Sequence, residues 1–245
     1  MGEARRPDTT FWVEPGAVEG SRLTLDPDES RHLLRVHRAT PGTPFEAVDG
    51  DGTTYHCVLE TAHDGVAIGR VDRTDRDRGE LPVSIHLLVG LPDPAATESV
   101  VEHAVPLGAS VLDFVACERS GRPAMGPSRI ERLARLARSG VKQSRRSRLP
   151  AIRSSDSLAD GITRAPEGER LAADPAGTVF SGERRQSAQA DAVLAVGPPG
   201  GFTEAELQLL QEAGFRLISL GPSRLTSETA AIALLALFRN SLPHK

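Results

Sequence analysis

Two short loops near the C-terminal end of the chain have the composition of ligand-binding loops. The first spans residues 197–201, Gly-Pro-Pro-Gly-Gly, between an apolar stretch and a segment of helical character. Glycines let backbone N–H groups approach a ligand closely, and prolines stiffen the loop. The spacing matches neither the GxGxxG dinucleotide fingerprint nor the GxxxxGK[ST] phosphate loop. This loop is therefore either a tight connection or a ligand loop of another type.

The second loop, residues 220–230 (LGPSRLTSETA), follows an apolar stretch and opens a C-terminal segment rich in Ala and Leu. Ser227 is a natural helix N-cap, and Glu228 lies where the helix dipole favours a carboxylate. Capping alone would explain both residues. Ligands of open α/β sheets bind beyond the carboxyl ends of the strands, so both loops lie where chemistry is expected.

A basic block occupies residues 118–153 of an otherwise acidic chain. It holds eleven basic residues and two acidic ones, although the whole chain has a net charge of −4. Such a block is the kind of footprint that a polyanion would recognise, because each neutralised phosphate releases condensed counterions. The alternative is that the arginines form a solvated face, since the chain uses Arg almost exclusively for positive charge.

The segments that must position these loops alternate between apolar runs and stretches of helical character. Four compact apolar runs, VSIHLLVGL, ASVLDFVA, DAVLAVG and FRLISLG, predict buried parallel strands in an α/β domain. Helices are expected over residues 95–107, 127–144, 203–213 and 227–242. Thr203 and Glu206 have the capping-box spacing, and Gly214 is placed as a C-cap glycine.

The N-terminal part of the chain has a different pattern. Short apolar stretches between residues 11 and 71, separated by Pro-Gly and Asp-Gly, predict small antiparallel strands. A short helix is expected after Asp26 as N-cap, and it ends before Pro41. The charged segment 71–82 has the composition of a linker. The predicted boundaries are 1–75 for a small β-barrel, 76–82 for a linker and 83–245 for the α/β domain.

Composition limits the class of protein. The 245 residues include 39% hydrophobic and 25% charged residues, which is ordinary for a folded globular chain. The longest apolar run is far below the roughly 20 residues that cross a bilayer, and the N-terminus has no apolar signal core, so we expect a cytoplasmic location. Cys57 and Cys117 have no metal-ligand spacing, which predicts two buried thiols and no metal site. His32 and His37 are five residues apart and are not expected to share a helical face, so surface or packing roles are favoured over ligation.

The two loops together, in this order and this close to the C-terminus, resemble those of the SPOUT superfamily of knotted S-adenosylmethionine methyltransferases. Within it, the chain is similar to the bacterial family that methylates N3 of a uridine in small-subunit ribosomal RNA. GPPGGF and LGPSRLTSETA stand where that family has Gly-Pro-Glu-Gly-Gly-Phe and Leu-Gly-x-Arg-Ile-Leu-Arg-x-Glu-Thr. SRHLLRVHRATPGTPFEAVDGDG, Glu118-Arg-Ser and KQSRRSRLPAI resemble further family segments, so the similarity extends over nearly the whole chain.

The resemblance implies an α/β methyltransferase domain with a deep trefoil knot, preceded by a PUA-like barrel of RNA-binding type. It also implies a homodimer that acts on ribosomal RNA or the small ribosomal subunit, with S-adenosylmethionine held by three loops. The third loop is expected near residues 171–174. The residues that match cofactor-binding positions are Ala172, Ala173, Gly197, Pro198, Gly200, Gly201, Leu220, Gly221, Leu225 and Ser227.

Removing the proton from uridine N3 needs a base or a cation that stabilises the developing charge on O2 or O4. Arg119 and Arg224 are the candidates for charge stabilisation. Glu228 is the acid beside the donor loop, with a structural role at the helix end as its alternative. Phosphate contacts are expected from the residues Arg35, Arg38, Arg145, Arg146 and Arg148.

The chain also departs from the family pattern near the expected target pocket. Pro199 replaces the Glu of the glycine loop, Ser223 and Thr226 replace two arginines, and Pro106 replaces another Glu. The residues that match donor-binding positions of the family are therefore retained more fully than those that match its acceptor contacts. Three hypotheses stay open: a ribosomal RNA methyltransferase, a related enzyme with another RNA or a small molecule as acceptor, and a donor-binding RNA module without catalysis.

Overall fold

The computed structural model describes residues 10–14, 16–180 and 191–243, and the chain divides into two compact units. The first unit runs up to Glu80 and includes Arg138–Leu149. The second comprises Leu81–Ala137 and the chain from Pro150 onward. The first unit thus takes in a piece of chain that the predicted boundaries place in the second domain. As limits of functional domains, 1–75, 76–82 and 83–245 stay a prediction.

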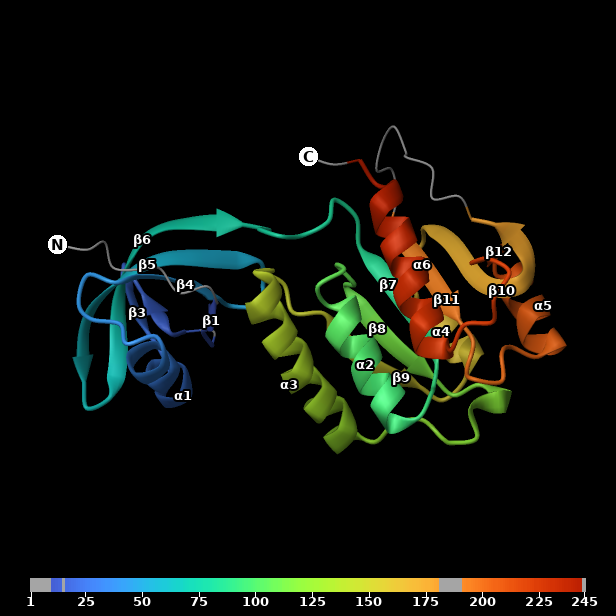
Figure 1. Cartoon of the computed structure of the whole chain (residues 1–245), viewed down its shortest axis with the longest axis horizontal. Coiled ribbons are helices and arrows are strands. Elements are labelled where there is room, and N and C mark those ends of the chain that lie inside the picture. Colours follow the sequence, from blue (N-terminus) through green and yellow to red (C-terminus); the bar gives the residue numbers. More distant parts are fainter. Residues whose placement is uncertain (1–9, 15, 181–190, 244–245) are drawn as a thin grey trace. The chain divides into compact units, whose positions relative to one another are not determined.

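The first unit is built on a six-stranded sheet with the order β1-β4-β5-β6-β3-β2 (Figure 1). Its pairs are antiparallel except for β1 with β4. The strands are β1 (Phe11–Trp12), β2 (Val18–Glu19), β3 (Arg22–Thr24), β4 (Pro44–Val48), β5 (Thr53–His63) and β6 (Val66–Arg76). Buried apolar side chains, among them Phe11, Leu33 and Phe45, form its core. The expected N-terminal domain of small antiparallel strands is confirmed as a half-barrel sheet.

The first half of the charged segment 71–82 is a strand, and residues 77–82 follow it without regular structure. β6 continues to Arg76 and pairs with β5 over nearly its whole length. Some of its charged residues bond to side chains of the neighbouring strand, as in the hydrogen bond of 2.7 Å between the Asp75 carboxylate and His56 Nε2. The composition was misleading because an exposed strand carries the same charged residues as a linker.

Helix α1 (Pro27–Arg31) begins at the predicted N-cap, since the Asp26 carboxylate accepts bonds from two backbone N–H groups of the first turn. A π-helical turn, η1 (His32–Val36), follows directly. In a π-helix residues i and i+5 lie in register, because the N–H of one bonds to the carbonyl of the other. His37 and His32 make this bond, and their rings lie 4.8 Å apart. The expectation that the two histidines do not share a face is therefore wrong, whereas their packing role against Phe11 is confirmed.

The second unit contains a six-stranded parallel sheet with the order β12-β10-β11-β7-β8-β9. All five strand pairs are parallel. The four predicted strands are β7 (Ile85–Gly90), β8 (Val111–Val115), β11 (Ala192–Val196) and β12 (Arg216–Ser219). Two further strands, β9 (Ala151–Ser155) and β10 (Glu169–Val179), lacked a compact apolar run in the sequence. The predicted parallel α/β domain is confirmed, and the trefoil knot stays a prediction.

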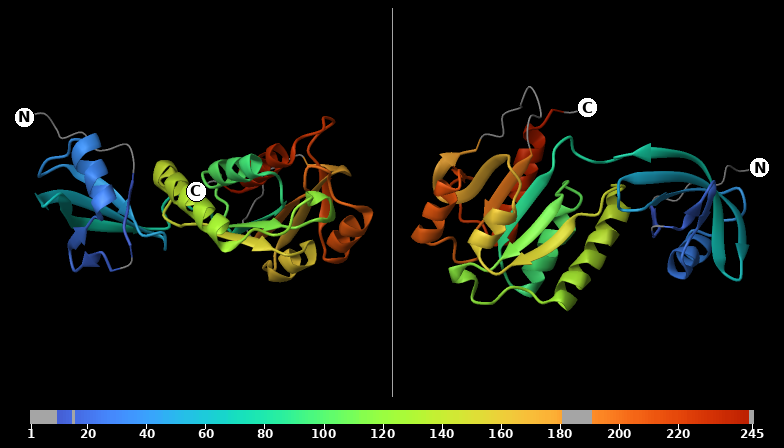
Figure 2. Two further views of the ribbon diagram at one scale, coloured as in Figure 1. Left: turned by 90° about the horizontal axis from the view of Figure 1, so that it is seen from below. Right: turned by 180° about the vertical axis from the view of Figure 1, so that it is seen from behind.

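Helices lie on both faces of this sheet, with α2 and α6 on one face and α4 and α5 on the other (Figure 2). The elements are α2 (Pro94–Ala104), the 3-10 turn η2 (Glu118–Ser120), α3 (Pro127–Ser144), α4 (Leu158–Arg164), α5 (Glu204–Glu212) and α6 (Ser227–Ser241). The four predicted helices are present, and α4 was not predicted. The capping box of Thr203 and Glu206 is confirmed, and Gly214 follows α5 with a φ of +83°.

Cys57 and Cys117 are buried free thiols, as predicted, and burial raises the pKa of each to about 12. Within the described ranges, no helix is long and apolar enough to cross a membrane. The same ranges contain no cluster of three or more His, Cys, Asp or Glu side chains that could hold a metal ion.

Candidate functional site

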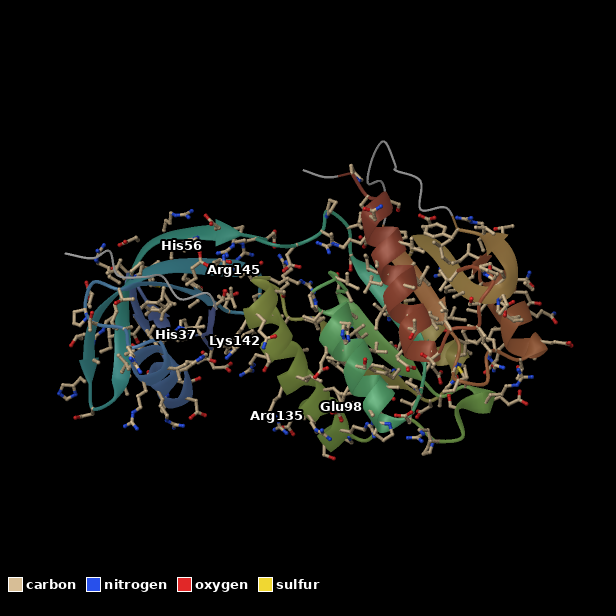
Figure 3. All side chains as sticks on the ribbon, in the orientation of Figure 1. His37, His56, Glu98, Arg135, Lys142 and Arg145 are labelled. Atoms are coloured by element: carbon tan, nitrogen blue, oxygen red, sulfur yellow. The ribbon has the colours of Figure 1, made fainter. Side chains whose placement is uncertain are left out.

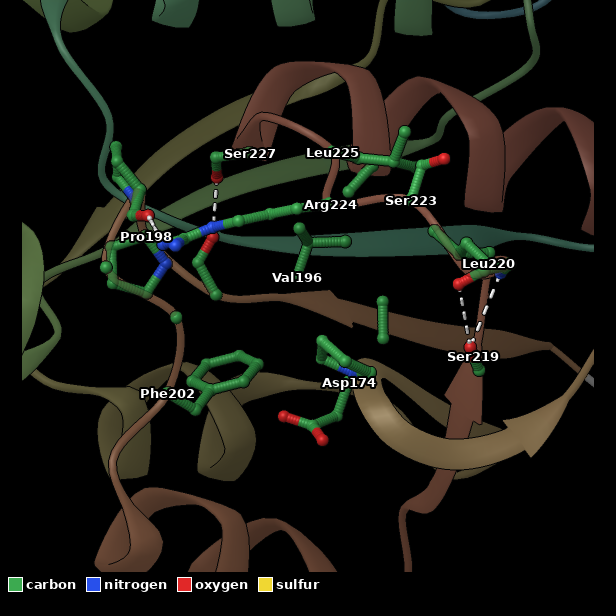
Figure 4. A pocket seen from close by; sticks show the side chains of 18 of the residues that line it. Asp174, Val196, Pro198, Phe202, Ser219, Leu220, Ser223, Arg224, Leu225 and Ser227 are labelled. Carbon is green, nitrogen blue, oxygen red and sulfur yellow. Dashed lines mark hydrogen bonds between the residues drawn. The ribbon is translucent and has the colours of Figure 1, made fainter.

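A cavity of about 510 Å³ opens at the carboxyl ends of β11 and β12 and beside the middle of β10, entirely within the second unit (Figure 4). Its walls come from three loops that lie far apart in the sequence. The lining residues are Arg119, Ala173, Asp174, Pro175, Val196, Gly197, Pro198, Pro199, Gly200, Gly201, Phe202, Ser219, Leu220, Gly221, Pro222, Ser223, Arg224, Leu225, Ser227 and Ala230. Nine of the ten predicted cofactor-binding residues are in this set.

The glycine loop, residues 197–201, forms the wall after β11. A bond of 2.7 Å from the Gly201 N–H to the Pro198 carbonyl closes the turn, and Gly201 has a φ of +72°. Below the loop lies Gly90, the last residue of β7. A Cβ atom at Gly90 would come within 2.3 Å of the Pro198 nitrogen, so only glycine lets the loop lie this close to the sheet.

The second loop is tied to the glycine loop by a side chain. The Ser227 hydroxyl donates to the Gly197 carbonyl at 2.5 Å. Ser227 is therefore not the N-cap of α6, as the sequence suggested. Thr226 has that role, because its hydroxyl accepts from the Thr229 N–H. The cap shifted by one residue because the Ser227 side chain is buried between the two loops.

The third wall is an irregularity in β10. Ala173 and Thr178 both pair with Ile218 of β12, so the residues between them bulge out of the strand. The bulge brings Asp174 and Pro175 to the cavity. Ala173 lines the cavity as well, whereas Ala172, predicted beside it, is fully buried in the hydrophobic core.

Three charged side chains line the cavity: Arg119, Arg224 and Asp174. The Arg224 guanidinium lies 3.5 Å from the Pro199 carbonyl, and Figure 4 shows it beside Pro198 and Ser227. Glu228 is partly buried in the first turn of α6 and, among the described residues, is not part of the cavity wall. Both arginines proposed for charge stabilisation therefore face the cavity, and Glu228 has the position of a helix-end carboxylate.

The replaced family positions fall in different places. Pro199 and Ser223 line the cavity, and Thr226 caps α6. Pro106 follows α2, before the start of β8, and so lies at the opposite ends of the strands. Pro106 is not among the described residues that line this cavity, and its expected place near the target pocket stays a prediction.

Several lining residues were missed from the sequence, in particular Val196, Phe202, Ser219 and Ala230. Val196 and Ser219 are the last residues of β11 and β12, and Ala230 lies one turn into α6. For Val196, Ser219 and Ala230 the only sequence signal is this position, whereas Phe202 is the last residue of the GPPGGF motif. Val196, Phe202 and Ala230 add apolar surface to the cavity wall, and Ser219 adds a hydroxyl group.

Ion pairs neutralise part of the basic block, mostly with acids from elsewhere in the chain. Six of its eleven basic residues form ion pairs, which are Arg132–Glu98, Arg135–Glu131, Arg138–Glu14, Lys142–Glu29, Arg146–Glu80 and Arg148–Asp77. Lys142 and Arg145 project from the C-terminal end of α3 and the turn that follows (Figure 3). The sequence could not show this pairing, because most of the partners are more than 30 residues away.

The predicted phosphate contacts differ in exposure. Arg146 is 2% exposed, and its guanidinium donates twice to Glu80, so it is not available to a phosphate. Arg148 is half-exposed and bonds to Asp77 at 2.6 Å. Arg35, Arg38 and Arg145 are exposed. Arg38 and Arg145 both have left-handed backbone conformations, with φ of +53° and +57°.

Comparison with known proteins relates this architecture to one family. Residues 79–239 match the RNA methyltransferase domain, and residues 25–69 match the RNA methyltransferase PUA domain. The ribosomal RNA small subunit methyltransferase E of Mycobacterium tuberculosis is 31% identical over 91% of this chain and 88% of its own length. The chain belongs to the ribosomal RNA small subunit methyltransferase E family.

Other members support the assignment. The enzyme of the same name from Synechocystis is 28% identical over 91% of this chain and 75% of its own length. The crystal structure of the Neisseria gonorrhoeae enzyme, bound to S-adenosyl methionine, superposes with a TM-score of 0.82 at 25% identity and covers 93% of this chain and 95% of that chain. The family resemblance read from the two loops is thereby confirmed, and so is the expectation of an RNA methyltransferase.

The cavity fits the predicted cofactor. Its volume lies in the usual range of about 300–1,000 Å³ for small-molecule sites. Phe202, Val196 and Leu225 offer apolar surface for a flat base, and Asp174 offers a negative charge for a ligand that carries a sulfonium. The two glycine-containing loops also line the cavity, and their backbone N–H and carbonyl groups could bind the rest of such a ligand.

Proposed function

We propose that this chain transfers a methyl group from S-adenosylmethionine to N3 of a uridine in 16S ribosomal RNA, in the cytoplasm and as a homodimer. The observation that carries the proposal is the cavity formed by three loops at one edge of the parallel sheet, in a chain of this family. The donor supplies an electrophilic methyl group on sulfur. The protein must hold the donor, exclude water and place the acceptor nitrogen in line with that methyl group.

We assign binding of the donor to the loops at residues 173–175, 197–201 and 220–227. Arg224 and Arg119 both face the cavity. A guanidinium there stabilises the negative charge that develops on uracil O2 or O4 as the N3 proton leaves. Glu228 remains a candidate for the acid–base role only through its place in the first turn of α6, since it does not line the cavity wall formed by the described residues.

For the RNA, we propose phosphate contacts from Arg35, Arg38, Arg145 and Arg148. Arg146 is excluded because it is buried against Glu80. Arg35 and Arg38 lie on and just after the π-helical turn, with exposed side chains. Irregular helical turns of this kind often occur at functional sites. Both residues lie within residues 25–69, which match the RNA methyltransferase PUA domain, and this match supports a role in RNA binding.

The homodimer rests on apolar surface of α6. Leu234, Leu235 and Phe238 of α6 are buried within the unit, whereas Ile232 and Leu237 are partly exposed and could form an interface. A self-complementary contact through such side chains is the usual form of a two-fold dimer. Light scattering at micromolar concentration should give about twice the chain mass, and a mass of 26.1 kDa would contradict the dimer.

A second candidate is methylation of a different acceptor, either another RNA or a small molecule. Pro199 and Ser223 favour it, because both line the cavity where family members carry charged residues. The experiment that separates the two supplies labelled S-adenosylmethionine with 16S ribosomal RNA, 30S particles or a metabolite extract. Label at N3 of a single uridine supports the main proposal, and label only in another acceptor supports the second. Donor binding without transfer to any of them would point to a binding module.

A further inference from the structure

Glu206 makes one bond more than its helix cap requires. In the first turn of α5, its Oε2 atom accepts from the Thr203 N–H at 2.9 Å, which completes the capping box. Its Oε1 atom accepts from the Glu118 N–H, also at 2.9 Å. A capping box needs only the first of these bonds. The second joins α5 to η2, a turn that lies 88 residues earlier in the sequence.

The turn that Glu206 holds has a defined shape of its own. The backbone N–H of Cys117 bonds to the Ser120 hydroxyl at 3.1 Å, and Gly121 ends the turn with a φ of +66°. Cys117 is buried beside Glu206, and burial together with the negative charge of Glu206 raises the pKa of its thiol to about 12. The carboxylate is therefore surrounded by donors, which fixes the position of the turn relative to α5.

Arg119 is the central residue of this turn, and its side chain lies across the glycine loop. Nη1 donates to the Gly200 carbonyl at 3.1 Å and to the Phe202 carbonyl at 3.2 Å. A Cβ atom at Gly200 would lie 3.0 Å from the Cβ of Arg119, so the arginine stem packs directly on that glycine. The loop is thus held by an arginine whose own turn is held by Glu206.

We propose that Glu206 is a positioning residue for donor binding: by fixing η2, it places Arg119 so that the glycine loop is already ordered before the donor arrives. This inference rests on the proposed assignment of the donor to the three-loop cavity. Glycine-rich loops lose much backbone entropy on ordering. A loop held in its binding conformation beforehand spares the ligand that cost, which appears as higher affinity.

Matched variants of the full-length protein separate this role from helix capping. Glu206→Gln weakens both carboxylate bonds, including the one to η2. Thr203→Ala removes the hydroxyl of the capping box and leaves the Glu206 carboxylate in place. Glu212→Gln is the control, because it changes an exposed glutamate of the same helix whose carboxylate accepts a bond from Gln208 of that helix.

Calorimetry with S-adenosylmethionine and S-adenosylhomocysteine should show affinities about tenfold lower for Glu206→Gln, equivalent to about 1.4 kcal/mol. Thr203→Ala and Glu212→Gln should stay within about twofold of the parent. Hydrogen exchange in the ligand-free protein should show faster exchange of the backbone amides around residues 200–203 in Glu206→Gln alone. A Glu206→Gln, Arg119→Gln double variant should bind the donor no more weakly than Arg119→Gln, because both residues act through one loop.

Equal donor affinity of Glu206→Gln and the parent, with only a lower melting temperature, would show that Glu206 is a cap and nothing more. Additive losses in the double variant would also overturn the proposal, because Glu206 would then act without Arg119. If the parent itself binds neither ligand, the assignment of the cavity fails instead, and the exchange measurement still reports whether Glu206 orders the loop.

Discussion

Backbone groups shape the cavity of the second unit, whereas charged side chains dominate the segment Arg145–Arg148 of the first. Around the cavity, Gly90 and Gly201 permit close approach and a left-handed turn, and few charged side chains are involved. In the arginine segment, Glu80 accepts bonds from the Arg146 guanidinium and from the backbone N–H groups of Ser147 and Arg148. A glycine-rich loop can therefore be recognised from the sequence alone. Whether an arginine can bind a ligand depends on the acids that lie near it in the folded chain.

The largest loss of stability is expected when Glu80, the acid that pairs with Arg146, is removed. Glu80→Ala leaves the buried Arg146 without its carboxylate, which costs about 3–5 kcal/mol for a broken buried pair. Chemical denaturation would measure the loss. Asp77→Ala is the matched control, since its pair with Arg148 is half-exposed and contributes about 0–1 kcal/mol. Equal losses in the two variants would mean that burial of an ion pair does not determine its contribution to stability in this protein.

A somewhat smaller loss of stability is expected at the donor loop, together with loss of ligand binding. Gly90→Ala places a Cβ atom against the Pro198 backbone, and overpacking of this kind costs about 1–3 kcal/mol. The loop must shift to accommodate it, so calorimetry should detect much weaker binding of S-adenosylmethionine. Gly126→Ala is the control, because its Cβ would have open space around it. Unchanged donor affinity in Gly90→Ala would show that the loop does not need its contact with β7.

The next effect concerns RNA and would sharpen the contrast between paired and exposed arginines. Replacing Arg35 and Arg38 with Ala should make the slope of log affinity against log salt shallower by about one to two units, since each neutralised phosphate contributes about 0.7–0.9. Arg132→Ala, which removes an arginine already paired with Glu98, should leave the slope unchanged. Filter binding with 16S ribosomal RNA over a salt series measures both. A slope that depends on Arg132 and not on the other two would reverse the assignment.

The smallest effect uses the one cysteine in each unit as a reporter. Burial raises the pKa of Cys57 and Cys117 to about 12, so at pH 8 almost no thiolate is present and neither thiol should react in the native protein. Labelling therefore requires opening of the unit that holds the thiol. In Glu80→Ala, Cys57 should label faster and Cys117 should not, which mass spectrometry of the labelled peptides would show. Equal acceleration at both would mean that the two units open together.

Periodicity and local motifs predicted much of the fold. Apolar runs located β7, β8, β11 and β12, because a strand buried on both faces must be apolar throughout. β9 and β10 escaped detection, since an edge strand and a bulged strand carry polar residues and Asp-Pro. The π-helical turn was also missed: its spacing of five residues does not fit a period of 3.6, and the packing of both rings against Phe11 joins residues that are distant in the sequence.

The sequence by itself determined the family, the two unlike halves of the chain and two of the three loops that line the cavity, because these features depend on the local order of glycines, prolines and apolar residues. The tertiary structure alone decided which charges are free to act. Arg146 is buried on Glu80, Ser227 bonds to the neighbouring loop and Glu206 reaches η2. Each of these contacts joins residues that are 30 to 88 positions apart. Coulombic and hydrogen-bonding partners are set by distance in space, and no local pattern of residue types records that distance.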